Sequence, residues 1–375
     1  MSNFPALRIL QISSAQSFGG GERHLADLAN GLARRGHDVH VALRSKSPLI
    51  TELAHVPKGN VTTLPLRNSL DAMSARHLSQ LVRKKQIQIL HAHMARDYPL
   101  AAYAARMNRG SKLIVTRHVL FDLNRLHRIT LSKAARVIAV SQAVASQLQA
   151  DAIAPSEKIS IVLNGIDTAK FQEARRNFTR SQFLDAWNLP RGCLLIGTVG
   201  ELTPLKGQEE FLRAAAQVLK QIPTAYFIVA GMDHSRRQEH RSRIKQLIEE
   251  LDLANHVKLV GWLDDLAQLY CALDVFVSAS HTESFGLALA EAMAAGTAVV
   301  ATETAGAREL IKPGETGLLV PIDDVDQLAA SIFGLLTNEN GRVRMGAAAQ
   351  KIAAQRFSIE RMIDETEKIY QESLQ

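Results

Sequence analysis

Short apolar runs alternate with amphipathic segments from the beginning of the chain. Residues 7–13 form an apolar run, and apolar positions then recur at helical spacing over residues 22–35. Gly36 predicts the end of that helix, and the alternating residues 38–43 predict a second strand. Strands that alternate with helices in this way predict a parallel sheet covered by helices on both faces.

The same alternation continues through most of the chain. Further strands are predicted at residues 87–92, 113–116, 136–140, 159–163, 194–199, 225–230, 257–260, 275–278 and 298–302. Further helices are predicted at residues 78–85, 100–107, 207–219, 241–251, 285–293 and 358–374. The sequence therefore indicates an α/β protein made of doubly wound parallel sheets.

Length and pattern together divide the chain into two domains. A chain of 375 residues is too long for one ordinary core. We predict an N-terminal domain at residues 1–170, a linker region at 171–191, a C-terminal domain at 192–356 and a final helical segment at 357–375. Ligands of such sheets bind beyond the carboxyl ends of the strands, so two facing sheets would hold a ligand in the cleft between them.

The segment from Glu283 to Glu291 carries the most specific chemical signal. Its two carboxylates bracket an apolar run, and Ser284 is predicted to cap a helix that ends at Gly296. A helix start offers unpaired N–H groups that suit a phosphate, and Glu291 would lie roughly 9 Å further along. This spacing favours a nucleotide sugar, with one carboxylate for ribose hydroxyls and one for sugar hydroxyls.

Two strand-to-helix turns add candidate phosphate contacts. Gly19, Gly20 and Gly21 follow the first strand and would let the backbone approach an oxyanion closely, although they do not form the GxGxxG fingerprint. Lys206 follows the strand at 194–199 and could neutralise a leaving diphosphate. A plain surface lysine is the alternative for Lys206.

Histidines mark the ends of two strands of the first half. His91 and His93 lie two residues apart, hence on one face of a strand, but no third ligand is evident, so we predict no metal site. His118 ends another strand and could touch a donor sugar or phosphate, with a structural role as the alternative. The pair Asp264-Asp265 is expected to cap a helix rather than to bind a metal.

Composition narrows the class of protein. Hydrophobic residues make up 46% of the chain and charged residues 22%, as in a globular enzyme, and no apolar run is long enough to span a membrane. Only Cys193 and Cys271 are present, which favours a reducing cytoplasm, and the N-terminus lacks a secretion signal.

The formal net charge is +7, with many of the basic residues in the first half. A basic face could bind an anionic membrane or an acidic small molecule, or could simply be solvated. Nucleic acid is not expected, because aromatic residues make up 5% of the chain and do not alternate with basic ones.

Several motifs, in this order, resemble the retaining GT-B glycosyltransferases of the large GT4-type family. They are Gly19-Gly20-Gly21-Glu22, Val140-Ser141, Asn164-Gly165-Ile166-Asp167, Val199-Gly200 with Lys206-Gly207, Glu283 with Glu291 after seven intervening residues, and Thr316-Gly317-Leu318. The match runs over nearly the whole chain. It implies two Rossmann-like domains facing across a cleft, with the nucleotide-sugar donor held mainly by the second domain and the acceptor by the first.

The resemblance also implies roles for individual residues. Glu283, His118 and Lys206 would be the catalytic residues, and Glu22, His93 and Arg96 would contact the acceptor. The donor contacts would be Gly20, Gly21, Glu201, Lys206, Ser284, Phe285, Gly286, Leu287 and Glu291. Such enzymes retain the anomeric configuration by a front-face attack, so neither a metal nor a cofactor other than the UDP-, GDP- or ADP-sugar would be required.

One position departs from the family pattern. Glu201 stands where the family usually has arginine, and a carboxylate beside a diphosphate would repel it by several kcal/mol. Glu201 would then turn away, meet the acceptor, or leave the phosphate charge to Lys206 and a nearby arginine.

The leading expectation is a cytoplasmic glycosyltransferase of glycoconjugate, lipopolysaccharide or envelope polysaccharide biosynthesis. Its acceptor could be anionic or lipid-linked, and the enzyme could then sit peripherally on the inner face of a membrane. The alternatives are another GT-B activity, a sugar-nucleotide epimerase or a phosphorylase, and a non-catalytic sugar-nucleotide-binding protein.

Overall fold

The computed structural model describes residues 5–123, 125–263 and 265–375. The described residues divide into two compact units. Unit 1 comprises residues up to Gly165 together with Ile359–Gln375, and unit 2 comprises Ile166–Ser358.

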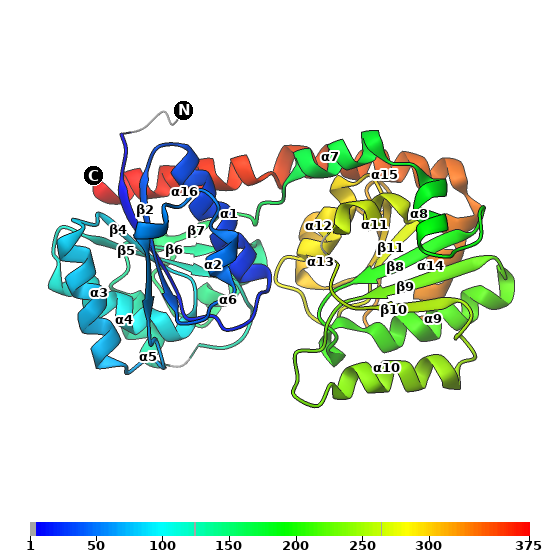
Figure 1. Ribbon diagram of the computed structural model, residues 1–375, viewed down its shortest axis with the longest axis horizontal. Coiled ribbons are helices and arrows are strands. Elements are labelled where there is room, and N and C mark those ends of the chain that lie inside the picture. The colour runs from blue at the N-terminus through cyan, green and yellow to red at the C-terminus, as the bar shows by residue number, and fades with distance from the viewer. Residues whose placement is uncertain (1–4, 124, 264) are drawn as a thin grey trace. The chain divides into compact units, whose positions relative to one another are not determined.

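Unit 1 is built on a seven-stranded sheet with the strand order β3-β2-β1-β4-β5-β6-β7 (Figure 1). Its strands are β1 (Arg8–Ser13), β2 (Asp38–Arg44), β3 (Val61–Leu64), β4 (Ile89–Ala92), β5 (Lys112–Arg117), β6 (Arg136–Ala139) and β7 (Ile159–Ile161). Its helices are α1 (Gly20–Arg34), α2 (Leu49–Glu52), α3 (Ala72–Lys84), α4 (Tyr98–Met107), α5 (Arg125–Leu131), α6 (Gln142–Ala150) and α16 (Ile359–Leu374), with short 3-10 turns η1 (Lys58–Asn60), η2 (Ala95–Asp97) and η3 (Ser156–Lys158).

Unit 2 repeats this plan with a six-stranded sheet in the order β10-β9-β8-β11-β12-β13. Its strands are β8 (Leu194–Val199), β9 (Ala225–Ala230), β10 (Val257–Val260), β11 (Val275–Ser278), β12 (Ala298–Thr302) and β13 (Leu318–Val320). Its helices are α7 (Thr168–Asn177), α8 (Arg180–Ala186), α9 (Gln208–Gln221), α10 (Glu239–Glu250), α11 (Leu266–Ala272), α12 (Leu287–Ala294), α13 (Ala305–Leu310), α14 (Val325–Thr337) and α15 (Glu339–Arg356), with the 3-10 turn η4 (Pro204–Lys206).

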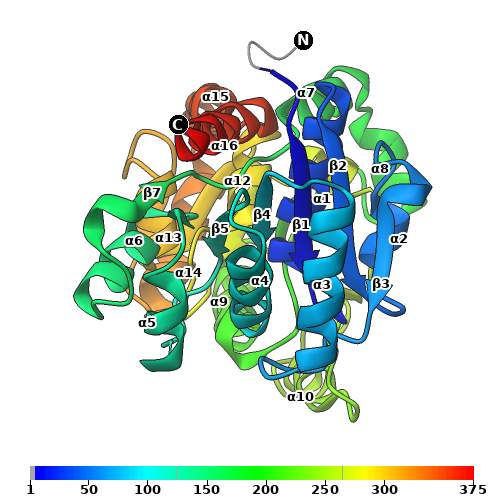
Figure 2. The same cartoon turned by 90° about the vertical axis from the view of Figure 1, so that its left-hand side faces the viewer.

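Every strand pair in both sheets is parallel, which confirms the predicted doubly wound α/β class. Alternate residues of a strand point to opposite faces of the sheet and pack into different hydrophobic layers. In unit 1, Leu10 and Ile12 pack into the layer that contains α3 and α4, whereas Ile9 packs into the layer that contains α1 and α16. Figure 2 shows α3 and α4 side by side over the sheet, where they make extensive contact.

The segment expected as a linker, residues 171–191, is largely helical and is grouped with unit 2. Arg180 ties α8 to that unit, because its guanidinium donates to the Asp274 carboxylate at 2.6 Å and to the carbonyl of Ala272. Arg175 on α7 likewise donates to the carbonyl of Cys271. These bonds explain how a segment of weak apolar order holds a defined conformation.

The last helix, α16, completes the core of unit 1. Ile363 and Tyr370 are buried against α1 and the sheet. Glu367 is also buried, and it accepts hydrogen bonds from Arg35 at 2.8 Å and from the ring of His37 at 3.0 Å. A charged network therefore attaches the C-terminal helix to the N-terminal part of the chain.

No described helix combines the length and the apolar character that crossing a membrane demands.

We expect Glu367→Ala to destabilise unit 1 by roughly 3 kcal/mol, because it leaves the buried N–H of His37 without its acceptor and removes one of the two carboxylates that pair with Arg35. Asp364→Ala is the matched control, since Asp364 pairs with the same Arg35 from an exposed position and should cost less than about 1 kcal/mol. Urea unfolding followed by circular dichroism measures both. Both tryptophans lie in unit 2, so their fluorescence transition should stay unchanged, and equal losses in the two variants would contradict the proposed attachment.

Candidate functional site

In unit 2, the candidate residues gather where β8 and β11 end. These two strands are neighbours in the sheet. The strands after β8 are added on one side of this pair and the strands after β11 on the other, so the winding direction reverses between β8 and β11. Open parallel sheets bind ligands beyond the carboxyl ends of the strands at this kind of reversal. Loop 200–207 follows β8, and loop 279–286 follows β11.

The two loops approach each other closely. Gly207 has a φ of +65°, and a Cβ there would lie 1.9 Å from the carbonyl oxygen of Ala279. The backbone N–H of His281 donates to the carbonyl of Leu205 at 2.9 Å. Only glycine combines this backbone conformation with this contact, which is why a glycine follows Lys206.

Lys206 and Glu283 meet where these loops touch. The Lys206 Nζ lies 2.5 Å from Oε1 of Glu283, and the Ser280 hydroxyl donates to the same oxygen at 3.1 Å. Both charged side chains are partly buried, with 31% of Lys206 and 18% of Glu283 exposed. The structure thus brings together two of the three residues that the sequence analysis expected to be catalytic.

The helix after this pair begins later than expected. α12 starts at Leu287 and is preceded by Gly286 with a φ of +98°, and no side chain caps it. The prediction that Ser284 caps this helix is therefore wrong. Phe285 turns instead into the core, where it packs edge-to-face on Phe357 at 5.8 Å between ring centroids.

Glu291 lies on the buried side of α12. It is 4% exposed, and the Tyr270 hydroxyl donates to it at 3.0 Å. Glu201, by contrast, is exposed, and its backbone carbonyl accepts a bond from the Gln208 side chain. Its carboxylate therefore lies in solvent rather than being buried beside Lys206.

In unit 1, the glycine turn opens α1. Gly20 and Gly21 are the first residues of the helix. Glu22 makes one half of a capping box, because its carboxylate accepts the N–H of Gly19 at 3.1 Å. Burial raises the pKa of this carboxyl despite the lowering effect of that bond. A Cβ on Gly21 would lie 3.4 Å from the ring of His118, so turn and histidine are neighbours.

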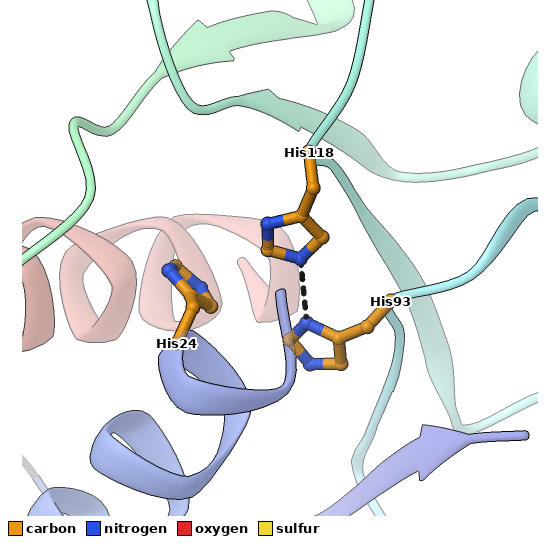
Figure 3. Close-up of side chains that lie close together, drawn as sticks. All are labelled: His24, His93 and His118. Atoms are coloured by element: carbon orange, nitrogen blue, oxygen red, sulfur yellow. Dashed lines mark hydrogen bonds between the residues drawn. The ribbon is translucent and has the colours of Figure 1, made fainter. Parts of the chain in front are cut away.

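His118 belongs to a cluster of polar side chains between the sheet and the helices α1 and α16. Hydrogen bonds connect the members in a chain: Tyr370 accepts from Gln11 at 3.1 Å, Gln11 accepts from His93 at 2.7 Å, and His93 Nδ1 lies 3.3 Å from His118 Nε2. His91 lies between Tyr370 at 2.6 Å and Thr116 at 2.7 Å. His24 on α1 also contacts the cluster, and Figure 3 shows its ring beside the rings of His93 and His118.

Burial keeps these rings neutral. It lowers the pKa of His24 to about 4, against a smaller raising effect of the hydrogen bond to Asn164. Burial is also the main reason why the pKa values of His93 and His118 lie well below the ordinary value, and neighbouring histidines lower them further.

The sequence analysis missed part of this cluster. The prediction considered the pair of His91 and His93, whereas the structure groups His93 with His24 and His118. One ring nitrogen of each of these three lies within 4.8 Å of the others. Gln11, Thr116 and Tyr370 were also missed. Arg96 is exposed on η2 and does not join the cluster.

Of the acidic pair before α11, the structure describes Asp265. Asp265 caps that helix as predicted, since its carboxylate accepts the N–H of Ala267 at 3.1 Å. Asp264 lies outside the described residues.

Sequence comparison places both units among glycosyltransferases. The family described as "Glycosyl transferases group 1" matches residues 180–352, and "Glycosyltransferase Family 4" matches residues 18–170. The chain is 30% identical to phosphatidyl-myo-inositol mannosyltransferase of Mycolicibacterium smegmatis, covering 88% of this chain and 84% of the relative. It is 25% identical to N-acetyl-alpha-D-glucosaminyl L-malate synthase of Bacillus anthracis, covering 97% and 96%.

A solved structure extends the likeness to the fold. HepE from Anabaena, solved in complex with UDP, is 25% identical, with a TM-score of 0.85 over 96% of this chain and 99% of its own. The same protein has been solved in complex with UDP-glucose.

We expect Gly207→Ala to destabilise unit 2 by about 2–4 kcal/mol, because the new methyl group meets a backbone carbonyl and the residue needs a positive φ. Gly334→Ala is the matched control: Gly334 lies within α14 with open space around it, so alanine should be neutral or stabilise by up to about 1 kcal/mol. Tryptophan fluorescence during urea unfolding measures unit 2 alone. Equal stability of the two variants would show that the loops do not require this close approach.

Proposed function

Because this chain belongs to the GT4-type glycosyltransferase family of GT-B fold, we propose that it transfers a sugar from a nucleoside-diphosphate sugar to a hydroxyl group of an acceptor. The pairing of Lys206 with Glu283 beyond β8 and β11 carries the proposal. It puts one cation and one carboxylate, both partly exposed, at the edge of the sheet where such folds bind nucleotides.

Lys206 is the donor's phosphate contact in this proposal. An ammonium beside the β-phosphate stabilises the negative charge that develops on it as the glycosidic bond breaks. The N–H groups of residues 284–287, at the start of α12, would stabilise the same negative charge, because the N-terminal end of a helix carries a partial positive charge.

Glu283 binds the hydroxyl groups of the donor sugar. Its carboxylate already accepts bonds from Lys206 and Ser280, so a sugar hydroxyl would add a further donor to a preorganised acceptor. Glu291 contacts the ribose, with Tyr270 holding its carboxylate. The binding of UDP and UDP-glucose by HepE supports this assignment of the donor class.

The acceptor side belongs to unit 1. Gly20 and Gly21 approach the donor phosphate or the acceptor, and His118 contacts the transferring sugar; Gly21 and His118 are neighbours in the structure. Of the residues expected to bind the acceptor, Glu22 and His93 already have internal partners, so the exposed Arg96 is the strongest contact for an anionic group. The name of the mannosyltransferase relative, which includes phosphatidyl-myo-inositol, fits an anionic acceptor of this kind, and a lipid-borne one would bring transfer to a membrane surface.

Transfer proceeds with retention of anomeric configuration. The acceptor oxygen bonds to the anomeric carbon on the face that the diphosphate leaves, the bond from that carbon to the phosphate oxygen breaks, and the acceptor proton passes to the departing phosphate. Lys206 and backbone N–H groups supply the positive charge, so the step needs no divalent cation at the diphosphate.

Incubation of the protein with UDP-, GDP- and ADP-sugars and candidate acceptors tests this directly, with a chelator present and the anomer of the product identified by NMR. An inverted product would overturn the front-face step, and an epimerised free donor would assign the chain to another activity.

Lys206→Ala should weaken the binding of UDP about tenfold or more, since a hydrogen bond to a charged group is lost. Isothermal titration calorimetry with UDP, or with GDP or ADP if one of these binds better, measures the change. Lys220→Ala, on the exposed last turn of α9, is the control and should bind as the wild type does. Equal affinities in the two variants would remove Lys206 from the phosphate site.

Glu283→Gln should lower the kcat/KM of transfer roughly a hundredfold, because an amide cannot match the charged acceptor at the sugar hydroxyls. The binding of free UDP should change little, as UDP has no sugar at that position. Glu249→Gln, exposed on α10, is the control. Turnover by Glu283→Gln at the wild-type rate would exclude the carboxylate from the site.

A further inference from the structure

Three histidine rings from separate elements converge inside unit 1. His24 comes from the second turn of α1, His93 directly follows β4, and His118 directly follows β5 (Figure 3). Their ring centroids lie 4.8 to 5.7 Å apart, and a ring nitrogen of each lies within 4.8 Å of the others. Both ring nitrogens of His91 have hydrogen-bond partners. In contrast, each of the three rings has a nitrogen that makes no hydrogen bond to a residue outside the group.

The outer hydrogen bonds fix which nitrogens carry lone pairs. Asn164 Oδ1 lies 2.9 Å from His24 Nδ1, so that nitrogen carries the proton and Nε2 carries the lone pair. Gln11 Oε1 lies 2.7 Å from His93 Nε2, and Gln11 uses its amide N–H on Tyr370, so His93 Nδ1 carries the lone pair. Carbonyl oxygens that accept the outer N–H in this way orient histidines toward metal ions.

Two of the three inner nitrogens have the spacing that a metal ion requires. Zinc–nitrogen bonds of about 2.0–2.1 Å at tetrahedral angles put neighbouring ligand nitrogens about 3.3–3.4 Å apart. His93 Nδ1 and His118 Nε2 are 3.3 Å apart. The His24 ring, at no more than 4.8 Å, needs a shift of about 1.4 Å at most to complete the triangle.

We propose that His24, His93 and His118 form a binding site for a zinc-class transition-metal ion. Imidazole nitrogens suit zinc and its neighbours, whereas magnesium and calcium prefer oxygen ligands, and no carboxylate belongs to this group. Three protein ligands leave the fourth position for a water molecule.

An unsatisfied nitrogen in the cluster supports the site independently. His24 Nε2 is buried and has no hydrogen-bond partner among the described residues, which is unfavourable for a polar atom. A metal ion would satisfy it. His118 Nδ1, the outer nitrogen of that ring, is likewise buried without a hydrogen-bond partner among the described residues.

The zinc site shares His118 with the proposed sugar contacts and His93 with the residues expected to bind the acceptor, but its test does not depend on the transfer reaction. All three ligands belong to unit 1, whereas Lys206, Glu283 and Glu291 belong to unit 2. Zinc binding can therefore be measured on the full chain without donor or acceptor.

To test the proposal, the metal-free full chain is titrated with zinc chloride and the heat of binding is measured by calorimetry. A second titration with Co²⁺ is followed by visible absorption. We expect one ion per chain at the cluster and the intense visible absorption of tetrahedral Co²⁺. His24→Ala and His118→Ala should each weaken zinc binding at least a hundredfold, and Asn164→Ala should weaken it about tenfold through the loss of its bond to His24. Circular dichroism checks that each variant is folded, and His118→Ala, at the partly exposed ring, serves if His24→Ala does not fold.

His281→Ala is the matched control, because His281 with Glu210 and Asp323 is the other group of metal-type ligands in the described part of the chain. It should leave the tight site unchanged. Absence of zinc binding by the wild type, an octahedral cobalt spectrum, or tight binding that survives both His24→Ala and His118→Ala would each overturn the proposal.

Discussion

The site in each unit depends on one constraint, which is that parallel strands end at the same edge of their sheet. A strand buried on both faces is a nearly continuous apolar run, so polar side chains concentrate toward its ends and in the loops beyond. In unit 2 this concentrates Lys206, Ser280 and Glu283 beyond β8 and β11. In unit 1 it concentrates His93 and His118 beyond β4 and β5.

The close contact of loops 200–207 and 279–286 turns this constraint into a defined geometry. Gly207 brings the first loop against the carbonyl of Ala279, and the Lys206–Glu283 pair lies directly beside that contact. The main chains that carry the side chains we assign to phosphate and sugar are therefore held together by direct backbone contact. Such rigidity is what electrostatic stabilisation of a developing charge requires.

Much of the fold could be predicted because each buried strand is a short apolar run between turn signals. β8, β9, β10, β11 and β12 have the bounds that the pattern predicted. β3, at the edge of its sheet and only partly buried, carries a weaker pattern and was not predicted, and neither were α14 and α15. The start of α12 was misplaced because Gly286, rather than Ser284, provides the turn into that helix.

The histidine cluster was harder to predict because its members come from five elements of the chain, β1, α1, β4, β5 and α16. One local signal was present: Gln11 follows Ile9, and His91 and His93 follow Ile89, at the two-residue spacing of one strand face. Those isoleucines pack in the layer with α1 and α16, so the polar residues face the same helices. His24 and Tyr370 on those helices could be added only once the packing was known, since helical spacing alone does not say which strand a helix covers.

The most direct measurement is a crystal structure of the protein with a bound nucleoside diphosphate. Our account predicts the pyrophosphate against Lys206 and the first residues of α12, with the ribose hydroxyls within hydrogen-bonding distance of Glu291. A nucleotide bound elsewhere, with Lys206 and Glu291 making no contact to it, would contradict the central claim.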